Sequence, residues 1–505
     1  MGKNNNQNNK NLIIDLQHIS KRYGGVQALI DVDFSLKEGE IHCLVGENGS
    51  GKSTLIKIIS GVEQPEKEAC IYIKGEKQTI LSPIISIQKG IQVIYQDLSL
   101  FSNLTVAENI TINNYSSGNL KLVNWKKIKD LAQKTLKKLG IQINPNQVVN
   151  SLSIADRQLV AICRAIATNA RLIIMDEPTS SLARHEINSL FSIIKELQKE
   201  GITILFVSHK LDEILEISER VTVLRDGTKV GVFQRNEIND QKLSFLMTGK
   251  EFANKKVTKT TIDEHILLQV KNLSKKGNYK NISFELHRGE ILGIIGMIGS
   301  GRTELAFSLF GINPPDQGEI LIEGKPIQLN SNKDAIQSGI AYVPEDRIEQ
   351  GLIMDQSIKN NITVTIFHQL LNHFNMVNRE KQENIAKHWI DKLSIRTPNT
   401  KNPVKTLSGG NQQKTVLAKW LSTNPKILIL DSPTVGIDVA AKHAIYTIMK
   451  ELSLKNIGII LISDEVQEVL YNCQRILLMR KGQFVQEFKP FEISEKKLNQ
   501  KIVEV

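Results

Sequence analysis

Short apolar runs alternate with longer amphipathic stretches along the chain. The segments Ile41–Val45, Ile173–Met175 and Ile202–Val207 are largely apolar, which is typical of strands buried on both faces of a sheet. Helix-length stretches with apolar residues on one face lie between such runs. This alternation indicates an α/β fold with a mainly parallel sheet, together with a helical insert in the middle of each half of the chain.

The chain carries this pattern twice. IHCLVGENGSGKSTL in the first half matches ILGIIGMIGSGRTEL in the second, and RLIIMDEPTSSL matches KILILDSPTVGI. A third match pairs NSLSIADRQLVAICRAI with KTLSGGNQQKTVLAKWL. Equivalent residues lie 250 to 255 positions apart in all three matches, which follow one another in the same order. We therefore interpret the chain as a tandem duplication.

The repeat predicts the domain boundaries. The first domain covers 12–250 and the second 266–505, joined by a short polar linker over 251–265. Residues 1–11 are polar and lack the apolar segment of a secretory signal, so we expect a disordered tail there.

The composition excludes fewer classes of function than the motifs do. The formal net charge of +11 is compatible with nucleic acid or an anionic membrane surface, but lysines scattered over a large protein explain it more simply. The four cysteines form no CxxC pair, so we expect reduced thiols in a cytosolic protein. No apolar run approaches the roughly 18 residues that span a bilayer, so any membrane role would come through a partner.

A glycine-rich loop after the first apolar run predicts a phosphate site. GENGSGKS fits the GxxxxGK[ST] pattern between a strand-like and a helix-like segment. Its backbone N–H groups and the helix N-terminus would surround phosphate oxygens. Lys52 would reach the terminal phosphates, and the Ser53 hydroxyl would bind Mg²⁺. The residues expected to contact the nucleotide here are Gly46, Glu47, Asn48, Gly49, Ser50, Gly51, Lys52, Ser53 and Thr54.

Two carboxylates end the apolar run RLIIMDE. Asp176 is placed to hold Mg²⁺, and Glu177 to polarise the attacking water as the catalytic base. A DE pair after a strand is a weak signal alone. Downstream of a phosphate loop it indicates nucleoside triphosphate hydrolysis.

These motifs resemble the ATP-binding-cassette (ABC) family over nearly the whole chain. The resemblance implies tandem P-loop domains, each with a mainly parallel sheet, flanking helices, an antiparallel β part and a helical subdomain. It implies that Tyr23 stacks on adenine, that Gln96 contacts Mg²⁺ and water and couples to a transport channel, and that His209 contacts the γ-phosphate. The family signature LSGGQ stands in the second copy as Leu407–Asn411.

The family binds nucleotide between the phosphate loop of one cassette and the signature of another. The resemblance therefore assigns Ser408, Gly409, Gly410 and the D-loop residue Asp438 to the nucleotide bound by the first copy. That site lacks nothing essential.

The reciprocal site departs from the family pattern at every position compared, and we expect it to bind nucleotide weakly or statically without turnover. Its departures are Arg302 for lysine, Ser432 for the catalytic glutamate, Asp464 for histidine, Glu345 for glutamine, Gly277 for tyrosine, Ile154 and Ala155 for the signature glycines, and Ala183 for the D-loop aspartate.

Within the family, the duplicated layout is most similar to the ATPases of bacterial simple-sugar importers. GSGRTEL, YVPEDR (342–347) and LSGGNQQK carry this likeness, and LSIADRQ is similar to the subset that imports the autoinducer-2 signal. The resemblance implies an ATP- and Mg²⁺-dependent subunit at the cytoplasmic face of the membrane. Its partners would be integral-membrane permease subunits and, indirectly, an extracytoplasmic solute-binding protein.

Two alternatives stay open at this point. Nucleoside importers use similar duplicated ATPases, and the cargo is chosen by other subunits. Soluble ABC ATPases that act on ribosomes or nucleic acid form the other class. The short linker, the damaged second site and the lack of a basic stripe interleaved with aromatic residues argue against it, so we expect no nucleic-acid partner.

Overall fold

The structure is a computed structural model of the chain, and it describes residues 11–116, 123–179, 182, 184–249, 263–297 and 299–504. The chain divides into two compact units, Met1–Phe252 and Ala253–Val505, each of which is described by itself. Nearly all of the predicted tail and linker lies outside the described residues.

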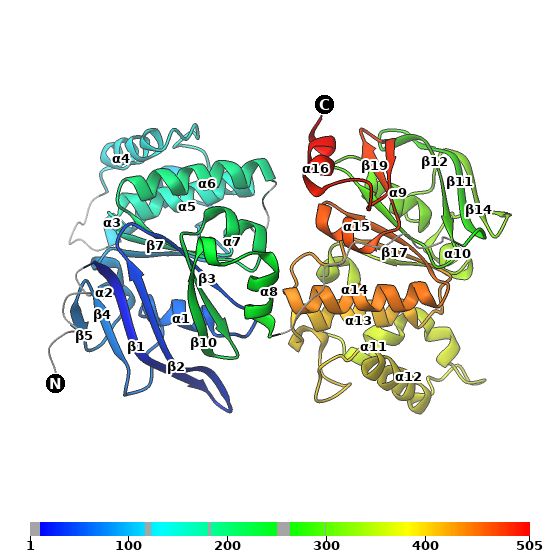
Figure 1. Cartoon of the computed structure of the whole chain (residues 1–505), viewed down its shortest axis with the longest axis horizontal. Helices are drawn as coiled ribbons and strands as arrows, with labels where there is room; N and C mark the ends of the chain where they lie inside the picture. The colour runs from blue at the N-terminus through cyan, green and yellow to red at the C-terminus, as the bar shows by residue number, and fades with distance from the viewer. Residues whose placement is uncertain are drawn as a thin grey trace. The chain divides into compact units, whose positions relative to one another are not determined.

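Unit 1 is built on a six-stranded sheet with the order β10-β9-β3-β8-β7-β6. All neighbouring strands are parallel except β10, which runs antiparallel to β9. The strands β3 (Ile41–Val45) and β8 (Thr203–Val207) are buried at every residue, because helices cover both faces of the sheet. Figure 1 shows α6 beside α5 on one side of these strands and α1 on the other.

The apolar side chains of the strands divide between the two faces. Leu205 belongs to the core cluster that contains α1, whereas the ring of its neighbour Phe206 packs edge-on against Phe191 of α6 at 5.8 Å between centroids. A second, antiparallel sheet with the order β2-β1-β4-β5 contributes Ile14 and Leu36 to the α1 cluster. The helix α1 therefore shares one core with both sheets.

A helical insert separates β6 from β7, where α3 packs against α4 and α5. The strands of unit 1 are β1 (Leu12–Tyr23), β2 (Val26–Lys37), β3 (Ile41–Val45), β4 (Cys70–Ile73), β5 (Glu76–Gln78), β6 (Ile91–Ile94), β7 (Leu172–Asp176), β8 (Thr203–Val207), β9 (Arg220–Arg225) and β10 (Thr228–Gln234). Its α-helices are α1 (Lys52–Ile59), α2 (Pro83–Gln88), α3 (Val106–Ser116), α4 (Trp125–Lys138), α5 (Ile154–Ala167), α6 (Arg184–Lys199), α7 (Leu211–Ile217) and α8 (Asp240–Thr248).

Unit 2 repeats this plan, with the parallel strands β16-β17-β18-β13-β19, the antiparallel edge strand β20 and the antiparallel sheet β12-β11-β14-β15. Its strands are β11 (Ile266–Lys275), β12 (Tyr279–His287), β13 (Ile291–Ile295), β14 (Gln317–Ile322), β15 (Lys325–Ile327), β16 (Ile340–Val343), β17 (Ile427–Asp431), β18 (Gly458–Ser463), β19 (Arg475–Arg480) and β20 (Gln483–Phe488). Its α-helices are α9 (Arg302–Leu309), α10 (Asn332–Gln337), α11 (Ile358–Thr363), α12 (Arg379–Lys392), α13 (Gly409–Leu421), α14 (Val439–Leu454), α15 (Val466–Asn472) and α16 (Glu495–Val503), and a π-helical turn η3 covers Arg347–Gly351.

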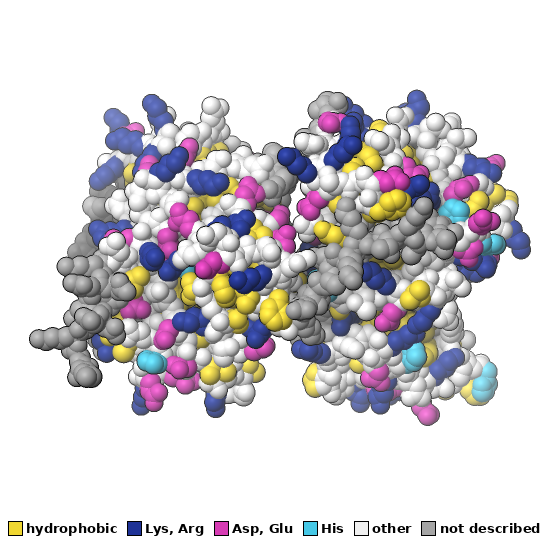
Figure 2. Space-filling model, in the orientation of Figure 1, with side chains coloured by type: hydrophobic (Ala, Val, Ile, Leu, Met, Phe, Trp, Pro, Cys, Tyr) yellow, Lys and Arg dark blue, Asp and Glu magenta, His cyan; other side chains and the backbone are white. Residues whose placement is uncertain are grey.

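The predicted fold class is thus confirmed, including the antiparallel β part and the helical insert of each unit. Among the described residues no helix is both long enough and apolar enough to cross a membrane. Figure 2 shows Lys and Arg side chains interspersed with Asp and Glu on the face in view of each unit, which is the scattered distribution expected from the composition.

Candidate functional site

Four segments of unit 1 meet at one edge of its parallel sheet. The phosphate loop follows β3, Asp176 ends β7, His209 comes just after β8, and Gln96 comes just after β6. Because β3, β8, β7 and β6 are parallel and adjacent, their carboxyl ends lie side by side. The topology therefore brings together residues that are far apart in the sequence.

The phosphate loop needs its glycines for close packing. Gly51, at φ 100°, stands immediately before α1, and a Cβ there would lie 2.5 Å from Cδ2 of Leu29 and 2.6 Å from the carbonyl oxygen of Ala28. A Cβ on Gly46 would lie 2.3 Å from the carbonyl oxygen of Leu224. The buried Lys52 ammonium donates to the carbonyl oxygens of Gly46 and Glu47, at 2.7 and 2.9 Å. The Lys52 side chain thus folds back onto the phosphate loop, where a bound nucleotide would place its phosphates.

The two carboxylates at the end of β7, Asp176 and the following Glu177, differ in their surroundings. Burial and the neighbouring Glu177 raise the pKa of Asp176, while Lys52 opposes them. Glu177 has a left-handed backbone, at φ 49°, and its N–H donates to the carbonyl oxygen of Val207 at 2.9 Å. A non-glycine residue in that conformation carries strain of roughly 1–3 kcal/mol and is often found at functional sites.

His209 orients the candidate base. Its Nδ1 lies 2.9 Å from Oε1 of Glu177, and both side chains are mostly buried. The hydrogen bond with His209 lowers the pKa of Glu177, and burial opposes this effect. Glu177 is therefore ionised at neutral pH and can accept a proton from water.

The residues present suit a nucleotide with a divalent cation. The Ser50 hydroxyl is buried inside the loop and has no hydrogen-bond partner among the described residues. Ser53 is exposed in the first turn of α1, and Asp176 is a part-buried carboxylate that a cation would stabilise. Ser53, Gln96 and Asp176 carry side-chain oxygens of the kind that Mg²⁺ prefers as ligands, and they would hold the ion.

Tyr23 ends β1 in the antiparallel sheet, and its side chain is 41% exposed. The Lys21 ammonium lies 5.3 Å from the ring centroid. The ring is thus accessible for stacking, as its predicted role requires.

The signature and D-loop residues lie in unit 2, at the starts of two helices. Ser408 precedes α13, which begins at Gly409. The Asp438 carboxylate caps α14 by accepting from the N–H of Ala441 at 2.7 Å. A Cβ on Gly410 would lie 2.6 Å from Cβ of Ala441, so this glycine also lets the two helices approach closely.

The phosphate loop of unit 2 holds its cation among carboxylates. Arg302 is buried, and its Nη1 donates to the carbonyl oxygen of Ser463 at 2.5 Å. Burial lowers the pKa of Arg302, and Asp464, Asp431 and Glu345 oppose this effect. Burial raises the pKa of Asp431 to about 6. Acidic side chains therefore surround the cation that would bind phosphates in unit 2.

The other departures also lie where they would weaken a nucleotide site. Ser432 has the same left-handed backbone as Glu177, at φ 46°, but carries no carboxylate. Gly277 lines a hollow beside Lys275 and Lys276 and offers no ring. Ile154 and Ala155 stand in the first turn of α5, whereas Ala183 lies outside the described residues.

One buried glutamate that belongs to none of the motifs contacts two of the segments at the site. Glu213 is buried, and its Oε2 accepts from the hydroxyls of Thr179, after β7, and Ser208, after β8, at 2.5 and 3.1 Å. It thereby ties together the segments that carry Glu177 and His209. Glu468 accepts from Thr434 at 2.9 Å in unit 2, and this repeated glutamate, 255 positions on, was the signal available in the sequence.

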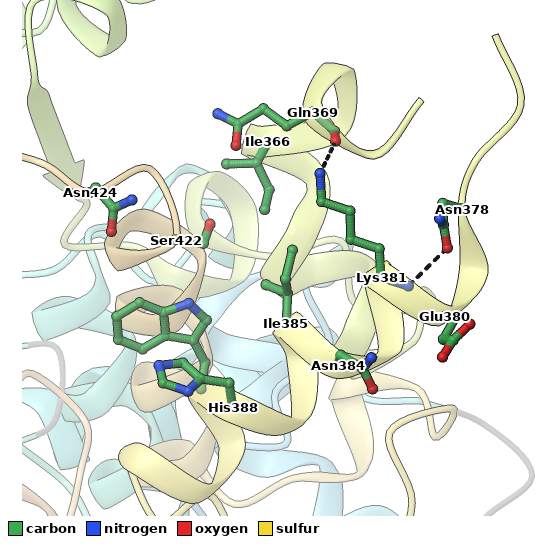
Figure 3. A pocket seen from close by; sticks show the side chains of 11 residues that line it. Ile366, Gln369, Asn378, Glu380, Lys381, Asn384, Ile385, His388, Ser422 and Asn424 are labelled. Atoms are coloured by element: carbon green, nitrogen blue, oxygen red, sulfur yellow. Dashed lines mark hydrogen bonds between the residues drawn. The ribbon is translucent and has the colours of Figure 1, made fainter. Parts of the chain in front are cut away.

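A separate hollow lies in the helical part of unit 2 (Figure 3). Ile385 and His388 of α12 line it, and Lys381 donates to the carbonyl oxygen of Gln369 at its rim. Its lining includes none of the predicted site residues.

Comparison with known proteins gives full-length matches. A family model described as ABC transporter matches residues 29–180 and 279–435. A protein of Agrobacterium fabrum named for ribose/galactose/methyl galactoside import is 43% identical over 94% of both chains. A ribose import ATP-binding protein of Shouchella clausii is 39% identical over 96% of this chain and 97% of its own. A xylose import ATP-binding protein of Moorella thermoacetica is 40% identical over 96% of this chain and 98% of its own.

Proposed function

Because the chain belongs to the ABC transporter family, we propose that it is the ATP-hydrolysing subunit of a sugar importer and that hydrolysis takes place at the site of unit 1. The observation that carries this proposal is the pairing of Glu177 with His209 beside a complete phosphate loop. Phosphoryl transfer depends on positioning and charge stabilisation, which a cationic loop, a metal ion and a base provide.

Each residue of unit 1 has a defined part in this proposal. The phosphate loop and Lys52 bind the phosphates, and Mg²⁺ held by Ser53, Gln96 and Asp176 would neutralise their charge. Glu177 accepts a proton from the attacking water. His209 orients Glu177 through a hydrogen bond that lowers its pKa, and by resemblance to the family His209 also contacts the γ-phosphate. Tyr23 offers its exposed ring to adenine.

The signature of unit 2 completes this site by resemblance to the family. Gly409 and Gly410 place the N-terminus of α13, with its unpaired N–H groups, where a phosphate can be bound. In this proposal Ser408 and Asp438 contact the same nucleotide. The nucleotide site based on Arg302 does not turn over, because it has acidic neighbours and Ser432 cannot act as a base near neutral pH.

The proposed cargo is a simple sugar, as in the names of the relatives. The chain would act at the cytoplasmic face of the membrane on integral-membrane permease subunits, which receive solute from an extracytoplasmic binding protein. A nucleoside cargo would leave the mechanism unchanged. Scattered charge gives little support to action on ribosomes or nucleic acid.

Steady-state hydrolysis of MgATP by the full chain tests the catalytic part of the proposal. We expect Glu177→Gln to lower kcat by about 100-fold or more while MgATP still binds, because a general base typically contributes 10²–10⁴-fold. Lys52→Ala should weaken MgATP binding itself. Lys57→Ala is the matched control, since Lys57 is exposed on the same helix. Wild-type activity in Glu177→Gln would disprove the assignment of the base.

A further inference from the structure

One arginine joins three segments of unit 2. Arg347 ends the PEDR sequence after β16 and begins η3. Its Nε donates to Oε1 of Gln412 at 3.3 Å. Its Nη1 donates to the carbonyl oxygen of Val435 at 3.0 Å, and Nη2 to that of Gly436 at 3.3 Å. Gln412 belongs to the first turns of α13, the signature helix, and Gly436 lies two residues before Asp438.

Two glycines make room for this guanidinium. A Cβ on Gly409 would lie 3.0 Å from Nη2, which is closer than such contacts normally come. Gly436 has φ +67°, and a Cβ there would lie 3.3 Å from Nη1. Gly409 therefore begins the signature helix and also leaves space for the guanidinium of Arg347.

The first repeat lacks this arrangement. Leu98 stands at the position of Arg347, counted from Gln96 and Glu345, and Ile154 stands at the position of Gly409. Leucine has no side-chain donor, and an isoleucine would fill the space that the guanidinium uses. The arginine and the glycine therefore go together in the repeat with the LSGGN signature.

The contacts of Arg347 favour a role in holding segments in place. Burial lowers the pKa of Arg347, but a guanidinium stays charged at any physiological pH. Its three acceptors, the side-chain oxygen of Gln412 and the carbonyl oxygens of Val435 and Gly436, are neutral. A hydrogen bond from a charged donor to each of them is stronger than one from a neutral donor. A planar fork that bonds to three acceptors holds their backbones in one relative position.

We propose that Arg347 is a positioning residue for ATP hydrolysis. It holds the start of the signature helix and the segment before Asp438 in a fixed arrangement, so that both meet the nucleotide together. It also links both to the loop that carries Glu345, two residues before it. This inference rests on the proposed function, because the signature of unit 2 acts on the nucleotide bound by unit 1.

Kinetics of the full chain test this role. We expect Arg347→Ala to lower kcat for MgATP roughly tenfold or more, because small misplacements of catalytic groups cost up to about 100-fold. Arg347→Lys should recover part of the loss, since an ammonium keeps the charge but not the fork. Arg288→Ala is the matched control: it removes an arginine of unit 2 that forms an ion pair with Glu323, and kcat should not change.

Binding and stability separate positioning from folding. MgADP should contact the phosphate loop of unit 1 without needing the signature, so its Kd should be unchanged in Arg347→Ala. The loss of the three hydrogen bonds of Arg347 should lower the thermal midpoint only slightly. Wild-type kcat in Arg347→Ala would overturn the proposal. A parallel loss of kcat, MgADP binding and thermal midpoint would also overturn it, because the residue would then be only structural. If the wild-type chain itself hydrolyses no ATP, the proposed function fails instead.

Discussion

At the scale of single residues, the site depends on groups held in unusual surroundings. Glu177 combines a left-handed backbone, partial burial and a hydrogen bond to His209. The motifs predicted Glu177 and His209 separately, because a carboxylate after a buried strand and a histidine after the next are family patterns. Their contact was beyond prediction because it joins side chains from segments that are distant in the sequence.

The pH dependence of hydrolysis tests the contact between His209 and Glu177. The hydrogen bond lowers the pKa of Glu177, so its removal should raise that pKa. The acidic limb of the kcat profile reports the pKa of the base in the bound complex. We expect His209→Ala to lower kcat and to shift this limb to higher pH. An unmoved limb, measured from the lowest pH at which the chain stays folded up to pH 8, would show that His209 does not tune Glu177.

At the scale of elements, the local sequence pattern was sufficient to predict structure that forms within one continuous segment. The strand, glycine loop and α1 follow one another within about twenty residues, and the apolar runs lie inside the buried strands. Contacts between segments were not predictable in this way. Arg347 bonds to residues more than sixty positions away, and the carboxylates near Arg302 include residues from three segments that are distant in the sequence.

Two glycines of the phosphate loop should respond differently to alanine. Gly51 and Gly49 both have positive φ, but only a Cβ on Gly51 would clash, with Leu29 and Ala28. Backbone strain thus affects both variants, while overpacking adds about 1–3 kcal/mol to Gly51→Ala alone. We expect Gly51→Ala to have the lower thermal midpoint when measured without nucleotide. Equal midpoints would mean that the contacts of Gly51 do not constrain the loop.

At the scale of the whole molecule, the two repeats share a fold but differ in the residues at the compared positions of the site. Both units have the same strand order, and Glu177 and Ser432 share the same backbone conformation. The repeats were recognisable from sequence alone because strand and loop motifs recur at nearly constant spacing.

Restoring one residue should therefore not restore the second site. Ser432→Glu supplies a carboxylate, yet Arg302, Gly277 and Asp464 remain unfavourable for turnover. We expect kcat per chain to stay near the wild-type value. A doubling of kcat, absent in the control Ser432→Gln, would show that the missing base was the only defect.

The central claim is that hydrolysis at Glu177 drives import of a sugar. Uptake in cells tests this claim most directly. Labelled pentoses, hexoses and ribonucleosides would be offered to cells that lack this gene and carry either the wild-type chain or Glu177→Gln. The account predicts that the wild-type chain restores uptake of a sugar and that Glu177→Gln, produced at the same level, does not. Sugar uptake that is unaffected by loss of the gene, or equally restored by Glu177→Gln, would contradict it.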